Sequence, residues 1–264
     1  MTAPAFGSAA AAPAPAPSLP ATTWLSIFLR LLAIQGAWNY ETLLGNGIGF
    51  CVEPALRHLP GGVHGPAFKE AMARESAYFN AHPYLASVAV GALARAELSG
   101  VPAERIERFR TALAGPLGSV GDRLVWAGWL PFTSLVSLAA FGLGARPLLV
   151  VCLFLLLYNA GHFALRIWGL RVGWTRGLAV APALGNPLLR GGPAHVGRAA
   201  AAAAGVALPL AAARVQEGGP SLLAGVLLGA ALLSVLLVRV HVRVEAYKLA
   251  LILIALFALF SVAR

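Results

Sequence analysis

Residues 124–145 read LVWAGWLPFTSLVSLAAFGLGA, and none of these 22 side chains carries a charge. An α-helix rises 1.5 Å per residue, so about 20 apolar residues cross the ~30 Å hydrocarbon layer of a bilayer. Residues 147–165 provide 19 further positions without an acid, lysine or arginine, and residues 218–238 provide 21. The sequence therefore predicts a membrane protein that is built from helices.

The composition of the whole chain supports this prediction. Of the 264 residues, 59% are hydrophobic and only 11% are charged, whereas soluble domains carry about 25% charged residues. The net charge of +10 comes from 20 Lys and Arg against 10 Asp and Glu. Most of the basic residues lie in or beside short connections between apolar runs, where they orient helices and meet anionic lipid headgroups. We expect contact with membrane lipid and no nucleic-acid binding, because no basic patch is interleaved with aromatic residues.

Two shorter apolar runs add possible crossings. Residues 249–263 provide 15 positions and can extend over Tyr247 and Lys248 if the lysine snorkels to the interface. Residues 199–213 also provide 15 positions, most of them alanine. We therefore predict an all-α, polytopic membrane protein with about four to six crossings, supplemented by re-entrant or interfacial helical segments.

The N-terminal part of the chain differs from these spans. Residues 1–22 are almost entirely Ala, Pro, Ser and Thr, so they predict a disordered tail that precedes one membrane domain over residues 23–264. Residues 23–44 have helical hydrophobic spacing, but Arg30 and Glu41 favour an interfacial or protein-packed helix over a lipid-exposed one. We expect the glycine-rich run at residues 45–49 to break this helix.

The segment at residues 53–123 is the least typical of a membrane span. Residues 64–78 and 104–110 predict short charged helices. Residues 83–96 are apolar but cover only about half a bilayer, a length typical of a re-entrant or half-crossing segment.

Two polar clusters stand out in the N-terminal half. Gln35 and the run Trp38–Glu41 combine amides, a carboxylate and an aromatic plane, which is a typical sugar-binding set; the alternative is a helix end with aromatic residues at the membrane interface. The run Phe79–Leu85 places Asn80 or His82 where it can cap a helix that starts near Pro83. That helix terminus can also direct free N–H groups at a polar ligand.

Two further clusters lie near the long spans. Gly115, Gly118 and Gly121 recur at spacing three before Asp122, which predicts a backbone able to bend and pack closely, with this acid anchoring the turn at the start of the first long span. Asn159, His162 and Arg166 share one helix face, which favours an interhelical hydrogen-bond network. The sequence has no phosphate-binding glycine loop, no metal-ligand spacing and no pair of nucleophile and base, so we expect no cofactor, no metal and no catalytic residue.

Three of these blocks together resemble the IID component of the mannose/fructose/sorbose family of sugar phosphotransferase permeases. Residues 38–41 look like the Trp-Asn-Tyr-Glu motif of that family. Residues 79–85 are similar to its Phe-Asn-Thr-His-Pro-Tyr block, with Ala81 in place of Thr. Residues 113–126 resemble its Met-Gly-Pro-Leu-Ala-Gly-Ile-Gly-Asp-Ser-Leu-Phe-Trp block, except that Arg123 follows the acid where the family usually has a small Ser. The resemblance covers roughly residues 24–180.

The resemblance implies a transport role without an enzymatic step of the chain's own. In this family the IID subunit pairs with a IIC membrane subunit to form the sugar channel, and the IIC–IID pairs assemble as trimers. Separate IIA and IIB proteins carry the phosphoryl group, and IIB phosphorylates the sugar inside. The implied location is the bacterial cytoplasmic (inner) membrane. A degenerate IID-like protein with a regulatory or scaffolding role and no transport is the alternative.

Polar placement and the motif match together select five candidate residues for the sugar pathway or the IIC contact. Asn39 and Glu41 are assigned to polar pairing near the sugar route, Asn80 and His82 to a hairpin tip, and Asp122 to the glycine-rich bend.

Overall fold

The computed structural model describes residues 17–218, and all regular elements within this range are helices. They are α1 (Ala21–Leu32), α2 (Gly45–Leu56), η1 (Gly62–His64), α3 (Pro66–Glu75), α4 (Ala86–Leu98), α5 (Ala103–Gly121), the π-helical segment η2 (Asp122–Trp129), α6 (Leu130–Gly142), α7 (Pro147–Arg176), η3 (Gly177–Ala179), α8 (Ala181–Leu184) and α9 (Pro187–Gly218). The prediction of an all-α membrane protein is confirmed. The predicted spans at 218–238 and 249–263, and nearly all of the predicted tail, lie outside the described residues.

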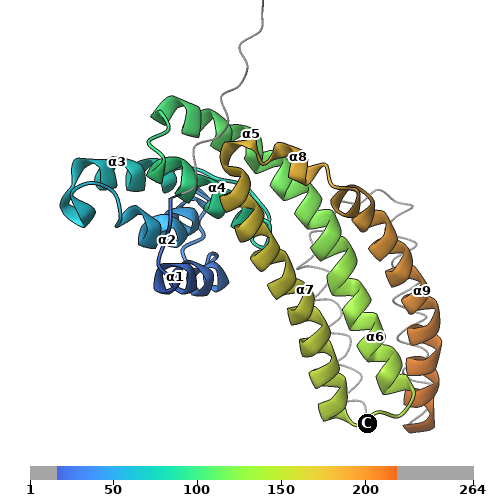
Figure 1. Ribbon diagram of the computed structural model, residues 1–264. Coiled ribbons are helices and arrows are strands. Elements are labelled where there is room, and N and C mark those ends of the chain that lie inside the picture. The colour runs from blue at the N-terminus through green and yellow to red at the C-terminus, as the bar shows by residue number, and fades with distance from the viewer. Residues whose placement is uncertain (1–16, 219–264) are drawn as a thin grey trace, which may run out of the picture.

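The helices form two parts (Figure 1). Helices α1 to α4 and most of α5 make a compact head, and α6, α7 and α9 run side by side as a long arm. The C-terminal half of α7 packs against α4 and so joins the arm to the head. The loop between α6 and α7 and the end of α9 lie at the far end of the arm.

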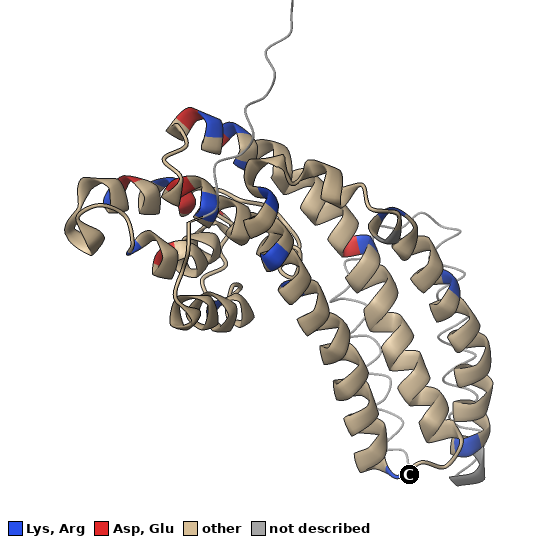
Figure 2. Ribbon diagram, viewed as in Figure 1, with Lys and Arg blue, Asp and Glu red and all other residues tan. Residues whose placement is uncertain are grey.

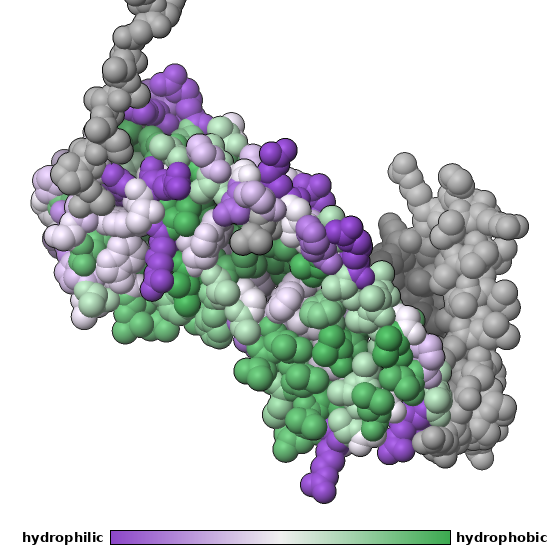
Figure 3. Space-filling model, turned by 45° about the vertical axis from the view of Figure 1, so that its right-hand side comes forward, coloured by the Kyte–Doolittle hydropathy of each residue, from purple (hydrophilic) through white to green (hydrophobic). Residues whose placement is uncertain are grey.

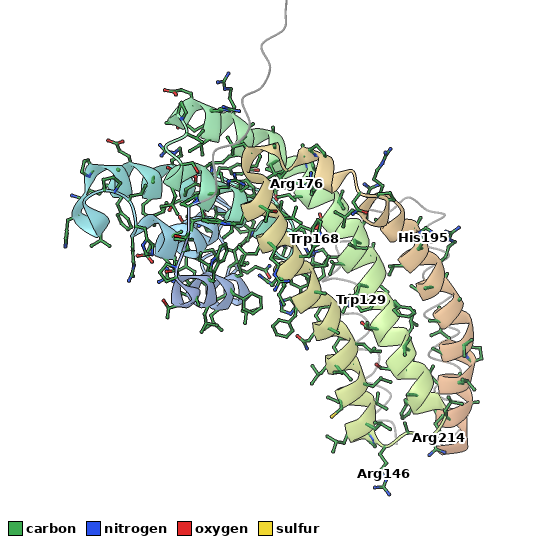
Figure 4. All side chains as sticks on the ribbon, in the orientation of Figure 1. Trp129, Arg146, Trp168, Arg176, His195 and Arg214 are labelled. Atoms are coloured by element: carbon green, nitrogen blue, oxygen red, sulfur yellow. The ribbon has the colours of Figure 1, made fainter. Side chains whose placement is uncertain are left out.

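The arm carries the membrane-spanning character. Three helical stretches are long and apolar enough to cross a membrane: Ala103–Gly142, Pro147–Ala179 and Ala181–Val215. They contain the predicted spans at 147–165 and 199–213 and most of the one at 124–145. Charged residues concentrate in the head and at the ends of the arm (Figure 2), and the arm surface between them is apolar (Figure 3). Arg146 and Arg214 mark the far end (Figure 4).

Helix α4 is the centre of the head, because all its residues from Ala86 to Glu97 are buried. Its contact with α7 depends on glycines that let the two backbones touch. A Cβ on Gly91 would lie 2.4 Å from the Leu170 carbonyl oxygen, and a Cβ on Gly173 would lie 2.1 Å from that of Val88. The predicted re-entrant segment at 83–96 is thus a protein-buried helix; its depth in a bilayer stays a prediction.

The glycine run at 45–49 starts a helix, so the prediction that it breaks one is wrong. Helix α1 ends at Leu32, and the chain turns through residues 33–44 before α2 begins at Gly45. The physical reason is close packing: a Cβ on Gly45 would lie 2.2 Å from the Ala77 carbonyl oxygen, and a Cβ on Gly47 would lie 2.0 Å from that of Ile34. These glycines allow the backbone of α2 to contact the backbone at Ala77 and Ile34.

The glycines before Asp122 do not interrupt the chain's helix. Residues 103–142 form one continuous 40-residue helix that passes through α5, η2 and α6 and changes direction between α5 and α6 (Figure 1). The glycines lower helix propensity by about 0.5–1 kcal/mol each relative to alanine, but one of them has a packing role. Gly121 leaves room for His82, since a Cβ there would lie 2.2 Å from the His82 Cβ. The predicted charged helices at 64–78 and 104–110 are confirmed within α3 and α5.

Candidate functional site

The first two motif blocks lie next to each other in the head. Leu43 and Phe79 form a parallel bridge, in which the Leu44 N–H donates to the Phe79 carbonyl oxygen at 3.0 Å and the Phe79 N–H donates to that of Thr42 at 3.1 Å. We call residues 38–44 and 77–85 the paired loops. The sequence identified each loop, and the fold holds them together although more than 30 positions separate them.

Asn39 shapes the first of the paired loops. Its Oδ1 accepts the N–H groups of Glu41 and Thr42, both at 2.9 Å. Its Nδ2 donates to the Thr42 Oγ1 at 2.9 Å and to the Ala37 carbonyl oxygen at 3.3 Å. A side-chain amide has two donor hydrogens and two acceptor lone pairs, so these four bonds use its full capacity. Asn39 stabilises a turn that also holds Leu43 at a positive φ of 50°.

The rest of the first loop faces outward. Tyr40 is 89% exposed and Trp38 is 45% exposed, and their rings contact edge to face with centroids 4.9 Å apart. Glu41 is exposed, and its carboxylate has no hydrogen-bond or ion-pair partner within residues 17–218. An aromatic plane beside a free carboxylate can take a ligand that combines a C–H face with hydroxyl groups.

His82 is the buried member of the second loop, with only 1% of its surface exposed. Its Nδ1 accepts the Tyr84 N–H at 3.2 Å, so the neutral ring carries its hydrogen on Nε2. Among the described residues this Nε2 has no hydrogen-bond partner. Burial, assisted by the charge of Arg166, lowers the pKa of His82 to about 4. The ring is therefore a neutral donor near neutral pH.

The regular part of α4 begins at Ala86, three residues after Pro83, with Leu85 at its N-cap and no side-chain hydrogen bond there. The expected capping is found one turn earlier and comes from His82. Its Nδ1 accepts the Tyr84 N–H at 3.2 Å and its carbonyl oxygen accepts the Ala86 N–H at 2.9 Å, so it caps the turn that leads into α4. Asn80 is exposed.

An aromatic and polar network connects His82 with the arm. The His82 ring contacts those of Tyr84 and Trp126, with centroids 4.9 Å and 5.0 Å apart. Tyr84 stacks on His162 at 4.4 Å, and the Arg166 guanidinium lies 4.8 Å from the Tyr84 ring centroid. Tyr84 and Trp126 belong to the matching blocks, but the sequence did not single them out as site residues.

The predicted polar face of α7 is confirmed as an interhelical network. Arg166 Nε donates to His162 Nε2 at 2.7 Å, and a second Arg166 nitrogen donates to the carbonyl oxygen of Leu31 in α1. His162 Nε2 is thus an acceptor, so the neutral ring has its hydrogen on Nδ1, which faces Asn159 Oδ1 at 3.3 Å. Trp129 (Figure 4) extends the network, since its indole N–H donates to the Tyr158 carbonyl oxygen at 3.4 Å.

Asp122 lies on the long helix, directly after Gly121, the residue that packs against His82. Its side chain is exposed, and in the described part of the chain it forms no ion pair with Arg123. Arg123 Nε instead donates to the Ser119 carbonyl oxygen at 3.0 Å. The fold therefore joins the two loops that carry Asn39, Glu41, Asn80 and His82, and places the helix of Asp122 against His82. Residues 17–218 hold no group of three potential metal ligands.

Comparisons with known proteins match this architecture. The sequence profile of the PTS system mannose/fructose/sorbose family IID component matches residues 18–190. The mannose-specific EIID component of Escherichia coli K12 is 31% identical over 172 residues, which cover 62% of this chain and 59% of the relative. The sorbose-specific EIID component of Klebsiella pneumoniae is 33% identical over 176 residues, covering 63% of this chain and 61% of the relative. The chain thus spans about three fifths of the length of these relatives.

Solved structures share the fold. A chain from the cryo-EM structure of the mannose transporter ManYZ in complex with microcin E492 aligns with a TM-score of 0.56 and 26% identity, over 76% of this chain and 71% of that one. A chain from a structure described as a membrane protein aligns with a TM-score of 0.60 and 26% identity, over 72% and 70% of the two chains.

Proposed function

Because the chain belongs to the mannose/fructose/sorbose IID family of the sugar phosphotransferase system, we propose that it is a subunit of a sugar permease. It pairs with a IIC membrane subunit, and the pair forms the translocation unit for a hexose. A separate IIB protein, charged by IIA, phosphorylates the sugar, so this chain has no catalytic residue. It crosses the cytoplasmic (inner) membrane several times, in contact with lipid, and functions as a trimer of IIC–IID pairs.

One observation carries the sugar assignment: an exposed aromatic and acidic surface lies on the loop that pairs with the loop of His82. Trp38 and Tyr40 offer ring faces on which the C–H face of a sugar packs. Glu41 has a free carboxylate that accepts a hydroxyl hydrogen. His82 contributes a buried N–H without a partner in the described residues, a donor that a polar ligand can satisfy.

The five candidate residues divide into contact and positioning roles. Glu41 and Asn80, both exposed on the paired loops, bind the sugar or the IIC subunit. His82 donates to the same ligand. Asn39 positions the first loop, because its own hydrogen-bonding groups are already used within the turn. Asp122 provides a polar contact for IIC at the start of the apolar arm.

The alternative is a IID-like protein that keeps the fold and has a regulatory or scaffolding role without transport. The observation in its favour is Arg123, an exposed cation directly beside Asp122. If the transport pathway requires a small neutral side chain there, this arginine blocks it while the fold and the IIC contact persist.

The test is co-purification of this protein with its candidate IIC subunit, one of them tagged, followed by sugar uptake with IIA and IIB present. We expect a stable detergent complex and uptake that Glu41→Ala and His82→Ala each reduce at least tenfold. Glu70→Ala, which changes an exposed acid on α3, is the matched control and leaves uptake unchanged.

Each failure has a distinct meaning. Two folded proteins that stay apart contradict the IIC partnership. A complex that forms without uptake supports the scaffolding alternative. Uptake and assembly that are both unchanged in Glu41→Ala and His82→Ala remove the basis for the proposed site while leaving the transport role in place.

A further inference from the structure

Four charged side chains are gathered inside the head where α3, α4 and α5 meet. Arg74 and Glu75 come from α3, Glu97 from α4 and Arg110 from α5. Glu75 is fully buried, Arg110 is 4% exposed and Glu97 is 7% exposed. We call these residues the buried charge cluster. Ionised groups so far from water need well-matched partners, so each oxygen of the two carboxyl groups has to be accounted for.

The two arginines satisfy three of the four carboxyl oxygens. Arg74 binds Glu97 with both arms of its guanidinium, from Nε to Oε1 and from Nη2 to Oε2, each at 2.8 Å. Arg110 Nη1 donates to Glu75 Oε2, and Arg110 Nη2 donates to the Ala77 carbonyl oxygen at 2.7 Å. Glu75 Oε1 is the exception: it is buried and has no donor in the described part of the chain.

Glu97 on the neighbouring helix α4 interacts with Glu75, and its charge acts unfavourably on an ionised Glu75. Two neighbouring carboxylates repel each other, and a buried oxygen without a donor is costly. A hydrogen on Oε1 removes both costs, because it neutralises Glu75 and supplies a donor to Glu97.

We propose that Glu75 is a protonated carboxylic acid at neutral pH, that its Oε1–H donates to the Glu97 carboxylate, and that the buried charge cluster is therefore a proton-binding site. The proton is the ligand, and Glu75 and Glu97 share it. The site does not depend on the proposed transport role.

The charges that act on Glu75 from the packed helices are those of Arg110 on α5 and Glu97 on α4, and they oppose each other. Arg74 on the helix of Glu75 is occupied by Glu97. Glu107 on α5 is exposed and acts on Arg74 instead of Glu75. Burial raises the pKa of Glu75, the charge of Arg110 opposes this rise, and the charge of Glu97 adds to it.

The proton site is coupled to the paired loops through one side chain. Arg110 donates to Glu75 and to the Ala77 carbonyl oxygen, and its guanidinium lies 5.3 Å from the Phe79 ring centroid. Phe79 in turn pairs with Thr42 and Leu44. Loss of the proton pushes the two carboxylates apart and disturbs the arginine that holds the second loop.

The decisive experiment is infrared spectroscopy of the purified full-length protein across a pH titration. The wild-type protein is expected to show the C=O stretch of a protonated carboxylic acid at neutral pH, and this band should disappear as the pH rises. Glu75→Gln should lack the band yet unfold at the same temperature as the wild type at neutral pH, because an amide offers the same donor and acceptor. Glu70→Gln, on the same helix but exposed, should keep the band.

Two results would overturn the proposal. One is the absence of the band in the wild type at neutral pH. The other is a band that persists in folded Glu75→Gln. If Glu75→Gln does not fold, the wild-type titration decides alone: disappearance of the band on alkalinisation supports the proton site, and a spectrum without it refutes the site.

Discussion

The hydroxyl oxygens of Tyr84 and Tyr158 are 2.6 Å apart, although 74 positions separate the two residues in the chain. Tyr84 belongs to the loop before α4, and Tyr158 lies on α7, one of the helical stretches long and apolar enough to cross a membrane. The bond therefore ties the paired loops of the head to the arm. Tyr84 also stacks on His162, so the second loop contacts α7 through two side chains.

Removing either hydroxyl should weaken this connection. Tyr84→Phe and Tyr158→Phe are each expected to lower the free energy of unfolding by about 0.5–1.5 kcal/mol, the net value of one hydrogen bond. The double variant should lose no more than the worse single variant, because both remove the same bond. Chemical denaturation in detergent measures the three values, and Tyr78→Phe, with a side chain 59% exposed, is the control. Losses that simply add would show that the hydroxyls act independently.

Arg166 should be far more sensitive to substitution than its neighbour Arg171 on the same helix. Arg166 is 2% exposed and bonds to His162 and to the Leu31 carbonyl oxygen. Arg166→Met keeps the apolar stem of the side chain but removes both of these hydrogen bonds, at a cost of about 1.5–3 kcal/mol. Arg171 is exposed, and Arg171→Met should change stability by less than about 0.5 kcal/mol. Equal melting temperatures for the two variants would argue against the network.

Substitution by alanine is expected to change the stability of the protein in opposite directions at Gly121 and Gly115, although both lie in α5. A Cβ on Gly121 would lie 2.2 Å from the His82 Cβ, so Gly121→Ala should displace the ring and lower both stability and sugar uptake. No described atom lies within 4 Å of a Cβ on Gly115. Gly115→Ala should therefore stabilise the helix by roughly 0.5–1 kcal/mol. Thermal unfolding of the two variants distinguishes them, and a stabilised Gly121→Ala would contradict the contact with His82.

The contrast between these two glycines shows what the sequence can predict. Hydropathy is a property of the chain alone, so the long apolar helices, such as Pro147–Arg176, were predictable. The charged helices of the head were also predictable from their composition. A glycine that ends a helix and a glycine that lets two helices touch look the same in one sequence. The run at 45–49 was misread for this reason, whereas the close packing expected of the glycines before Asp122 is found at Gly121.

The candidate site was likewise predictable only in part. The paired loops and the polar face of α7 were identified because polar residues are rare in this chain and their spacing is informative. Their mutual placement was not predictable, because the contacts of Leu43 with Phe79 and of Tyr84 with Tyr158 join positions far apart in the chain. Nor could one sequence show that the side-chain amide of Asn39 forms its hydrogen bonds within its own turn.

The stability of the protein should depend on pH through two buried groups with opposite signs. Burial raises the pKa of Glu75 from 4.5 to about 8, so the unfolded state releases its proton first and stability falls as pH rises between these values. Burial lowers the pKa of His82 from 6.5 to about 4, so the unfolded state gains a proton first and stability falls as pH drops between those values. The two effects oppose each other in the overlapping range.

Above about pH 6.5 the contribution of His82 fades, because its ring becomes neutral in the unfolded state as well, and Glu75 increasingly determines the slope. There the wild-type protein should lose up to about 1.4 kcal/mol of unfolding free energy per pH unit, levelling off beyond pH 8. Glu75→Gln should remove this slope, and Glu70→Gln should preserve it. Denaturation in one detergent at several pH values supplies the comparison. A wild-type profile that is flat between pH 6.5 and 8 would mean that Glu75 is ionised throughout, with Arg110 outweighing the effect of burial.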